Sequence, residues 1–589
     1  MKHGGFEKRT IQAGLVSLLL ILITLAAYWL VPGLDFVNYD DGAYVYENPN
    51  VIRGLTLEGV ARAFTGFCAS NWHPLTMLSL MLDVQLFGIN PAAHHLINLF
   101  FHLANTLLLF FFLLKATGRI WPCALTAALF AVHPLHVESV AWIAERKDVL
   151  SGFFGLGAML AYVYHVRGPS LKRYAAAVGL LTLSLLSKAM LVTAPALFLL
   201  LDFWPLGRIE WSELKRRDKI IPLLVEKLPL LALSLFFGVM AIAAQDQGGA
   251  LQPLDVKPLA PRLMNAVASY AGYLVKTFLP LDLAVFYPYP NAFPPADVLL
   301  SAAVLALVTV LAVRLRRRRP YCLTGWLWFL ISLTPVIGLV QVGMQSLADR
   351  YTYLPLIGIF IVLAFGLADL VQDRRPSGKI AATLAAAAVL ALAVLCHRQV
   401  GYWQNGETLF SRALAVTSNN TVASNGLGLH LFGARRYAEA EPFFLLSLAL
   451  NPRDGAVHRA LGTVYYEMRR LDEAEKHPRL AVNFRPEDAE ANFWLATVLR
   501  LRGKNDGARA LFRRAELLFH RDLQLNPTAR RHNLLGVALA QQTRLAEAEQ
   551  QFREAARLDP RYSEARSNLN KVLRLKNSAA PPPARIKAE

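Results

Sequence analysis

Two adjacent carboxylates, Asp40 and Asp41, follow the first long apolar run within the stretch FVNYDDGAYVYENPNV. One aspartate beside another can serve as a general base, because like-charge repulsion raises the pKa of one of them. The same pair can instead bind a divalent cation, since carboxylate oxygens are hard ligands. A solvated loop without chemistry is the plainest alternative. What decides between these interpretations is which other residues lie near the pair.

A run of four charges, ERKD at 145–148, stands later in the sequence. Arg146 and Lys147 suit a phosphate group, Arg through its planar fork of donors and Lys as a compact charge. Glu145 and Asp148 would then support these cations. The same four residues also fit a simple polar cap between two helices.

His133, His136 and Glu138 precede that run in HPLHVESV. At i and i+3 the two histidines would share one helix face, an arrangement that permits metal binding. Two imidazoles and one carboxylate are too few to define a zinc site. Metal binding at these three residues is therefore the less favoured interpretation.

Two further charged positions lie at the ends of later apolar runs. Lys188 interrupts LLSKAMLV, and Asp349 and Arg350 stand together in SLADRYTYLPLIG. A lysine extending to the membrane interface and an internal ion pair would explain them without a ligand. Phosphate binding by Lys188 and Arg350, with Asp349 in support, is the functional interpretation.

The composition indicates which elements must carry these residues. Of 589 residues, 55% are hydrophobic and 17% are charged, which excludes a disordered chain and is too apolar for an ordinary soluble enzyme. The net charge of +19 lies largely in short basic clusters between apolar runs. That distribution is typical of a multispanning membrane protein, so nucleic acid is not expected as a partner.

Eleven apolar runs approach membrane-spanning length, and a twelfth at 262–279 fits a re-entrant or interfacial segment. With eleven spans, every basic cluster falls on one side, and the positive-inside rule places the N-terminus in the cytoplasm and the C-terminus outside. All the acids and cations above then lie on the outer side. The predicted spans are 11–31, 96–114, 121–143, 149–165, 174–187, 189–203, 227–244, 296–313, 321–342, 351–371 and 380–396.

A repeat of 34 residues follows Cys396. The segments GLGLHL, ALGTVY and WLATVL begin at 426, 460 and 494, and small residues and prolines recur with the same spacing. This is the tetratricopeptide (TPR) pattern of paired helices. The third repeat is seven residues longer, which is two helical turns and predicts an extended helix. Pro478 stands where other repeats have phenylalanine and predicts a kink.

The sequence therefore predicts an all-α fold. A polytopic membrane domain occupies residues 1–400, an α-solenoid of TPR repeats occupies 401–576, and 577–589 form a disordered tail.

Five stretches, in the right order, resemble the transmembrane-and-tetratricopeptide (TMTC) family of protein O-mannosyltransferases, and its bacterial relatives most of all. The resemblance implies a membrane domain of the GT-C class of glycosyltransferases and a bacterial inner-membrane location. It also implies a sugar donor, mannose or a similar hexose, carried on polyprenyl phosphate. The stretches are FVNYDDGAYVYENPNV, NWHPLTMLSLMLDVQLFGINPAAHHLINLFFHLANTLLLF, ALFAVHPLHVESVAWIAERKDVLSG, LLSKAMLVTAPALFLLLDFWP and SLADRYTYLPLIG.

By this resemblance Asp40 or Asp41, with Asp40 preferred, deprotonates an acceptor hydroxyl in an inverting displacement at the outer membrane face. Arg146, Lys147, Lys188 and Arg350 would neutralise the departing lipid phosphate. Glu138, Glu145, Asp148, Asp349, His133 and His136 would support them. A glutamate is expected at the position of Asp349 in eukaryotic members, so this chain departs from the family there.

The repeats are expected to select a protein or peptide acceptor, and membrane lipid surrounds the bundle. A divalent cation held by Asp40 and Asp41 is a further expectation. Two other functions stay open at this point. One is a non-catalytic scaffold for envelope assembly, and the other is a polysaccharide polymerase or ligase with a lipid-linked donor.

Overall fold

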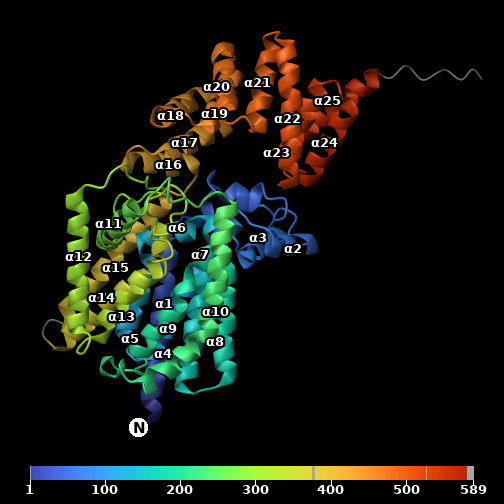
Figure 1. Ribbon diagram of the computed structural model, residues 1–589. Coiled ribbons are helices and arrows are strands. Elements are labelled where there is room, and N and C mark those ends of the chain that lie inside the picture. The colour runs from blue at the N-terminus through green and yellow to red at the C-terminus, as the bar shows by residue number, and fades with distance from the viewer. Residues whose placement is uncertain (1, 374–377, 526, 580–589) are drawn as a thin grey trace, which may run out of the picture. The chain divides into compact units, whose positions relative to one another are not determined.

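The computed structural model describes residues 2–373, 378–525 and 527–579 (Figure 1). This part of the chain is built from helices and short helical turns, with three isolated bridges, which confirms the predicted all-α fold. It divides into two compact units. The first contains residues 1–44 and 54–418, and the second contains 45–53 and 419–589.

The first unit is a helical bundle in which long apolar helices alternate with short ones. Its helices are α1 (Lys2–Ala27), α2 (Leu57–Thr65), α3 (Pro74–Phe87), α4 (Pro91–Thr117), α5 (Ile120–Val132), α6 (Val137–Ala141), α7 (Arg146–Arg167), α8 (Leu171–Ser187), α9 (Ala194–Phe203), α10 (Arg217–Gln247), α11 (Leu259–Phe278), α12 (Pro295–Leu315), α13 (Pro320–Leu333), α14 (Leu356–Asp373), α15 (Gly378–Gly401) and α16 (Gly406–Val416).

Six helices in the described ranges are long and apolar enough to cross a membrane, and a bent pair raises that number to seven. Four shorter apolar helices accompany them, so this unit is a multi-pass membrane domain, and the count of eleven spans stays a prediction. Helix α11, which covers the doubtful run 262–279, is not among the six. The six are Lys8–Gly33, Pro91–Thr117, Ile143–Arg167, Arg217–Gln247, Pro295–Leu315 and Gly378–Gly401.

The predicted spans 121–143 and 321–342 are among those that are not continuous helices. The run 121–143 bends by 55° where α5 ends, because Pro134 follows His133 and starts a new short helix. The run 321–342 is helical only to Leu333 as α13. In both places the chain leaves helical geometry close to charged residues, and so provides turns from which polar side chains can reach one another.

Glycines bring α13 and α14 into contact. A Cβ atom added to Gly325 would lie 2.3 Å from the carbonyl oxygen of Gly358, so no larger residue fits at this crossing. The short helix η7 (Asp349–Thr352) leads into α14 and is therefore held against the bundle by backbone-to-backbone packing.

Two basic residues of the connecting loops, Arg167 and Arg119, lie near the C-terminal end of α7. Arg167 at the end of α7 donates to the carbonyl of Ala116, and Arg119 pairs with Asp369 at 2.9 Å. Since α7 has 22 residues, its two ends are about 33 Å apart. These two basic residues are thus separated from the ERKD run by the length of a span, while the direction of the bundle in a membrane stays a prediction.

The second unit is a row of antiparallel helix pairs (Figure 1). Its helices are α17 (Thr421–Gly433), α18 (Tyr437–Leu450), α19 (Gly455–Glu467), α20 (Leu471–Phe484), α21 (Ala489–Leu501), α22 (Asn505–Leu525), α23 (Ala529–Gln541), α24 (Leu545–Leu558) and α25 (Ser563–Ala579). Residues 580–589 of the predicted tail lie outside the described residues.

The repeat pattern is explained by small residues packed under rings. Added Cβ atoms at Gly428 and Gly536 would lie 2.9 Å and 2.7 Å from the rings of Phe444 and Phe552. In the second repeat Pro478 takes the ring's place over Gly462, and α20 continues through it. Helix α22 has 21 residues where α18, α20 and α24 have 14, so the predicted extension by two turns is confirmed.

Candidate active site

Asp41 is fully buried and ties the loop after α1 to the turn before α7. Its carboxylate accepts hydrogen bonds from the backbone N–H groups of Val37, at 2.9 Å, and Ala144, at 3.0 Å. Burial raises the pKa of Asp41 to about 7, and these two donors oppose that rise. The side chain therefore holds the loop, and with it the neighbouring Asp40, against the bundle.

Asp40 is half-buried and faces cations. Burial raises the pKa of its carboxyl, while the nearby charges of Lys147 and Arg350 lower it. The preceding Tyr39 stacks on Trp142 with ring centroids 5.1 Å apart, and Arg350 Cζ lies 5.4 Å from the centroid of the Trp142 ring. The structure thus brings Asp40 together with two of the four predicted phosphate-binding residues.

Six charged side chains form an ion cluster beside Asp40. Glu145 lies at its centre, since it pairs with Lys147 at 3.1 Å and with Lys188 at 3.0 Å. Arg350 Nε reaches Glu145 at 3.2 Å. Two more acids complete the pairing, because buried ions require partners. Glu138 binds Arg350, and Asp148 pairs with Lys188 at 2.7 Å. The six members of the ion cluster are therefore Glu138, Glu145, Lys147, Asp148, Lys188 and Arg350.

Every member of the ion cluster stands near a helix end or a break. Glu145 closes the short helix η4 (Ile143–Glu145), and Lys147 is the second residue of α7, which follows η4 directly. Lys188 follows the last residue of α8 in an extended conformation. Arg350 lies on η7, whose backbone N–H donates to Glu138 at 3.0 Å. Breaks in apolar helices therefore gather charges that lie up to 212 residues apart.

Asp349 lies beside the ion cluster and has partners of its own. Its two carboxylate oxygens accept from Tyr287 Oη at 3.0 and 2.9 Å, and Lys276 donates to the same hydroxyl at 2.9 Å. Burial raises the pKa of Asp349 to about 6, against the opposing charge of Lys276. These contacts give Asp349 a supporting place behind Arg350.

Arg146 is not brought into the ion cluster by its contacts. It is fully buried and donates to Asp83 at 2.8 Å and to the carbonyl of His94 at 2.9 Å. It also donates to Ser79 and Asn98. Arg146 and Lys147 are consecutive on a helix and so point about 100° apart. Phosphate binding by Arg146 stays a prediction that these contacts do not favour.

The two histidines lie among aromatic rings and hydrogen-bond to backbone carbonyls. His133 Nε2 hydrogen-bonds to the carbonyl of Thr277 at 2.9 Å, and His136 Nδ1 to that of Phe130 at 2.8 Å. His136 also packs edge-on against Tyr353. Among the described residues there is no group of three or more His, Cys, Asp or Glu that could hold a metal ion.

Known proteins with similar sequences are named protein O-mannosyl-transferases. Protein O-mannosyl-transferase TMTC3 of Homo sapiens is 24% identical over 72% of this chain and 50% of its own. A protein O-mannosyl-transferase of Caenorhabditis elegans is 27% identical over 70% of this chain and 59% of its own. The homologues of the present chain are thus TMTC O-mannosyltransferases.

The chain spans about half the length of these curated relatives. A shorter match, to protein O-mannosyl-transferase TMTC1 of Mus musculus, is 36% identical over 22% of this chain and 14% of its own. The family model described as tetratricopeptide repeat matches residues 459–522 and 512–563. A thermophilic TPR protein of Thermus thermophilus is 21% identical over 33% of this chain and 96% of its own, with a TM-score of 0.24.

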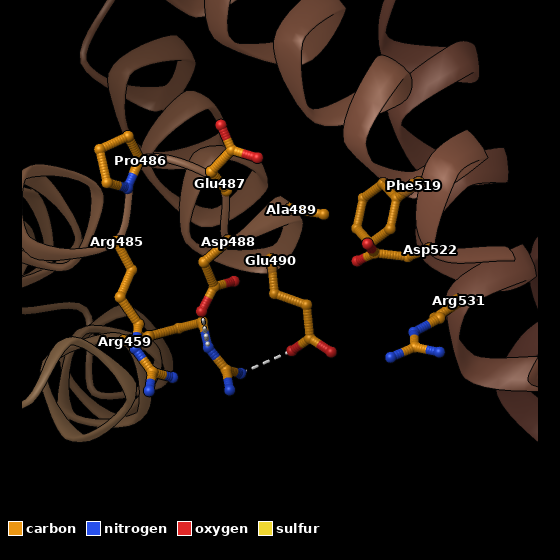
Figure 2. Close-up of a pocket in the computed structure, with 10 residues that line it drawn as sticks. All are labelled: Arg459, Arg485, Pro486, Glu487, Asp488, Ala489, Glu490, Phe519, Asp522 and Arg531. Carbon is orange, nitrogen blue, oxygen red and sulfur yellow. Dashed lines mark hydrogen bonds and ion pairs between the residues drawn. The ribbon is translucent and has the colours of Figure 1, made fainter. Parts of the chain in front are cut away.

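The repeat unit holds a pocket of about 470 Å³ next to the extension of α22 (Figure 2). The first 14 residues of α22, the length of its counterparts, end at residue 518. Phe519 and Asp522, which line the pocket, therefore belong to the two extra turns. Arg459 pairs inside it with Glu490 at 2.6 Å. The remaining lining residues are Arg485, Pro486, Glu487, Asp488, Ala489 and Arg531.

Sequence reasoning missed the neutral partners of the ion cluster. Tyr44 Oη accepts from Lys147 Nζ at 3.3 Å, and Trp142 lies between Tyr39 and the cations. His73 stacks flat on Tyr44. An aromatic or imidazole ring in an apolar neighbourhood resembles ordinary core, so no spacing could have distinguished these three residues from packing.

Proposed function

We propose that this chain transfers a hexose from a polyprenyl-phosphate carrier to a hydroxyl group of a protein acceptor. The observation that carries the proposal is the proximity of Asp40 to Lys147 and Arg350, because it sets a carboxylate beside two cations at the end of a membrane bundle. The homologues named as O-mannosyltransferases support mannose as the hexose.

The proposed reaction is a single displacement. The acceptor oxygen forms a bond to the anomeric carbon while its proton passes to Asp40, and the bond from that carbon to the phosphate oxygen breaks. The electron pair leaves with the lipid phosphate, whose growing charge Lys147, Lys188 and Arg350 would stabilise. Attack from the side opposite the leaving group would invert the anomeric centre.

Charge balance limits how such a site can work. The ion cluster has three cations and three acids, and Asp40 and Asp41 add two more carboxylates. A phosphate would be repelled if all five acids were ionised. The raised pKa of Asp41 favours its neutral form below about pH 7, which lowers that repulsion.

Exchange of the two aspartates tests the proposal. Asp40→Asn removes the base and should lower transfer of mannose from dolichyl phosphate mannose about 100-fold or more, measured in membranes with a peptide acceptor. Asp41→Asn should lower it less, since an amide can keep one backbone contact. Asp35→Asn, on an exposed residue of the same loop, is the control and should have no effect. Unchanged transfer in the Asp40 variant would exclude it as the base.

We further propose that the pocket of the repeat unit contacts the acceptor. Its wall carries Arg485, which has no ion-pair partner among the described residues, while Arg459 is engaged by Asp488 and Glu490. Figure 2 draws Arg485 beside Arg459, with Glu490 between them and Arg531. An acidic residue near the modified hydroxyl would suit Arg485.

A charge reversal tests this second proposal. Arg485→Glu should raise the KM for a peptide that carries aspartates next to its serine and leave the KM for the lipid-linked donor unchanged. Arg453→Glu, on an exposed residue of the preceding turn, is the matched control. Equal acceptor KM values for the two variants would contradict a role for the pocket.

A further inference from the structure

His73 stands at the boundary between the loop that carries Asp40 and helix α3. It is the N-cap of α3, yet its imidazole makes no capping hydrogen bond, and Pro74 starts the helix after it. The residue is only 3% exposed. A buried polar ring that does not cap its own helix requires another explanation.

The ring lies close to the cations of the ion cluster. It stacks on Tyr44 with centroids 5.3 Å apart and an interplanar angle of 11°. On Tyr44 lies Lys147, whose Nζ is 4.6 Å from the ring centroid and donates to the hydroxyl at 3.3 Å. One aromatic ring therefore contacts both the imidazole and the ammonium group.

A second contact fixes α3 next to Lys188. Thr76, one turn into the helix, donates to the carbonyl of Ser187 at 2.8 Å, and Ser187 directly precedes Lys188. Both residues of this contact are fully buried. The first turn of α3 is thus anchored to the connection that carries Lys188. The imidazole of His73, at the N-cap of the same helix, lies against Tyr44, which also contacts Lys147.

The Nε2 atom of His73 is buried and has no hydrogen-bond partner in the described part of the chain. Leaving such a group unpaired costs about 1–3 kcal/mol, so buried polar atoms of this kind usually meet a ligand or water. Burial, with the nearby charges of Lys147 and Lys188, lowers the pKa of His73. The ring is therefore neutral near pH 7 and can donate a hydrogen bond without adding charge.

His136 shows the contrast. Its Nε2 atom is also buried without a described partner, but its ring is enclosed by Phe130, Tyr353 and Phe360. None of these rings carries a charge that would attract an anion. At His73, by contrast, an unpaired imidazole nitrogen lies near Lys147 and Lys188, which the proposed function assigns to the donor phosphate.

We propose that His73 Nε2 donates a hydrogen bond to a phosphoryl oxygen of the lipid-linked donor, next to Lys147 and Lys188. This inference rests on the proposed function, since it names a further contact of the same site. His73 is a binding and positioning residue in this role and takes no part in proton transfer. A neutral donor suits the place, because it orients the phosphate between cations without competing for Glu145.

The test compares side chains that keep or lose a donor at the Nε2 position. The amide of Gln can reach the position of Nε2 and that of Asn the position of Nδ1. His73→Phe and His73→Asn should raise the KM for dolichyl phosphate mannose by about 10- to 100-fold with a smaller change in kcat. His73→Gln should restore most of the donor KM. A purely structural role would not produce this difference between Gln and Asn at equal thermal stability.

Binding without turnover separates this inference from the proposed function. Undecaprenyl phosphate and inorganic phosphate serve as probes for the purified full chain in detergent. If the chain binds undecaprenyl phosphate in a His73-dependent way yet transfers no sugar, the contact stands and the proposed reaction fails. If His73→Phe and His73→Asn keep the wild-type affinity for undecaprenyl phosphate and the wild-type donor KM, the contact is refuted.

The phosphate probe decides the source of the phosphoryl group. Inorganic phosphate should compete only weakly with undecaprenyl phosphate, because the lipid adds apolar contacts within the bundle. His73-dependent binding of inorganic phosphate, together with His73-independent binding of undecaprenyl phosphate, would overturn the assignment to a lipid. Should His73→Phe fail to fold, the comparison of Gln with Asn alone decides the matter.

Discussion

Two buried networks of charges lie near opposite ends of α7, and they differ in how fully their members are paired. The network near the C-terminal end of α7 is centred on Asp202. Its carboxylate accepts hydrogen bonds from Tyr162 Oη at 2.6 Å, Lys227 Nζ at 2.7 Å and Arg208 at 3.1 Å. Glu226 completes it by binding Arg208 at 2.7 Å. We call these five residues the Asp202 network.

The ion cluster at the start of α7 is less complete. Asp40 beside it is half-buried, and Trp142 Nε1 and His73 Nε2 are buried without a partner among the described residues. In the same part of the chain, the Asp202 network has no buried side-chain polar atom of that kind. A fully paired network fixes one geometry, whereas unpaired polar atoms beside charges can accept a ligand. The contrast predicts that the Asp202 network stabilises the bundle, and it supports the proposal that the ion cluster binds the donor phosphate.

Removal of one arginine from each network should produce the largest difference in sugar transfer between the two networks. Arg350→Gln deletes a cation of the ion cluster and should lower sugar transfer by about 100- to 1000-fold. Arg208→Gln deletes a cation of the Asp202 network and should lower thermal stability with transfer per folded molecule almost unchanged. The measurement is transfer normalised to folded protein in detergent. Equal losses of transfer in the two variants would mean that the networks do not divide the roles.

Stability should respond most to the centre of the Asp202 network. Asp202→Asn leaves Lys227 buried without its anion, which should cost about 3 kcal/mol of unfolding free energy. Joint exchange of Asp202→Leu and Lys227→Met removes both charges and should recover much of that loss. Thermal unfolding of the purified chain measures both changes. An additive loss in the double variant would show that the two residues do not act as a pair.

Sequence could identify the charged half of the ion cluster but not its neutral half. Lys147, Lys188 and Arg350 stand out because charges beside apolar runs are costly and therefore few. Nothing in the sequence separates Arg146 from Lys147, and only the helix start at Arg146 turns their side chains to different partners. Trp142 reads as core from its type alone.

The same limit applies to the fold. The 34-residue period predicts the repeats because each repeat must place a small residue under a ring, as at Gly428 and Gly536. The seven-residue excess predicts the longer α22, but the pocket lined by Phe519 depends on how the next pair packs. In the bundle, hydropathy locates apolar runs and cannot show that the run 121–143 bends at Pro134.

Acidity should distinguish Asp41 from an ordinary exposed carboxylate. Its pKa is about 7 in the folded chain against 3.8 as a free group, so the folded state holds a proton that the unfolded state has lost between those values. The stability that this carboxyl contributes is therefore present in acid and lost as the pH rises. From pH 5 to 7 the loss should be about 2 kcal/mol.

Thermal unfolding across that range is the measurement. Asp41→Asn should reduce the dependence on pH between 5 and 7, since the amide does not titrate, while Asp349, whose pKa burial raises to about 6, still does. Asp35→Asn, on an exposed carboxylate of the same loop, should leave the wild-type dependence intact. The raised pKa of Asp41 would be contradicted if the wild-type protein became more stable from pH 5 to 7 and the Asp41 variant showed the same increase.

The smallest effect should come from the rim of the Asp202 network. Glu226 is 18% exposed at its side chain, and its partner Arg208 is 26% exposed, so water screens their pair. Glu226→Gln should therefore cost less than about 1 kcal/mol, although it meets the same arginine and lysine as Asp202. Thermal unfolding beside Asp202→Asn measures the difference. A smaller loss for Glu226→Gln would show that burial, rather than the number of ion pairs, decides how much each carboxylate contributes to the free energy of unfolding. A Glu226→Gln variant as unstable as Asp202→Asn would show that the number of ion pairs matters more.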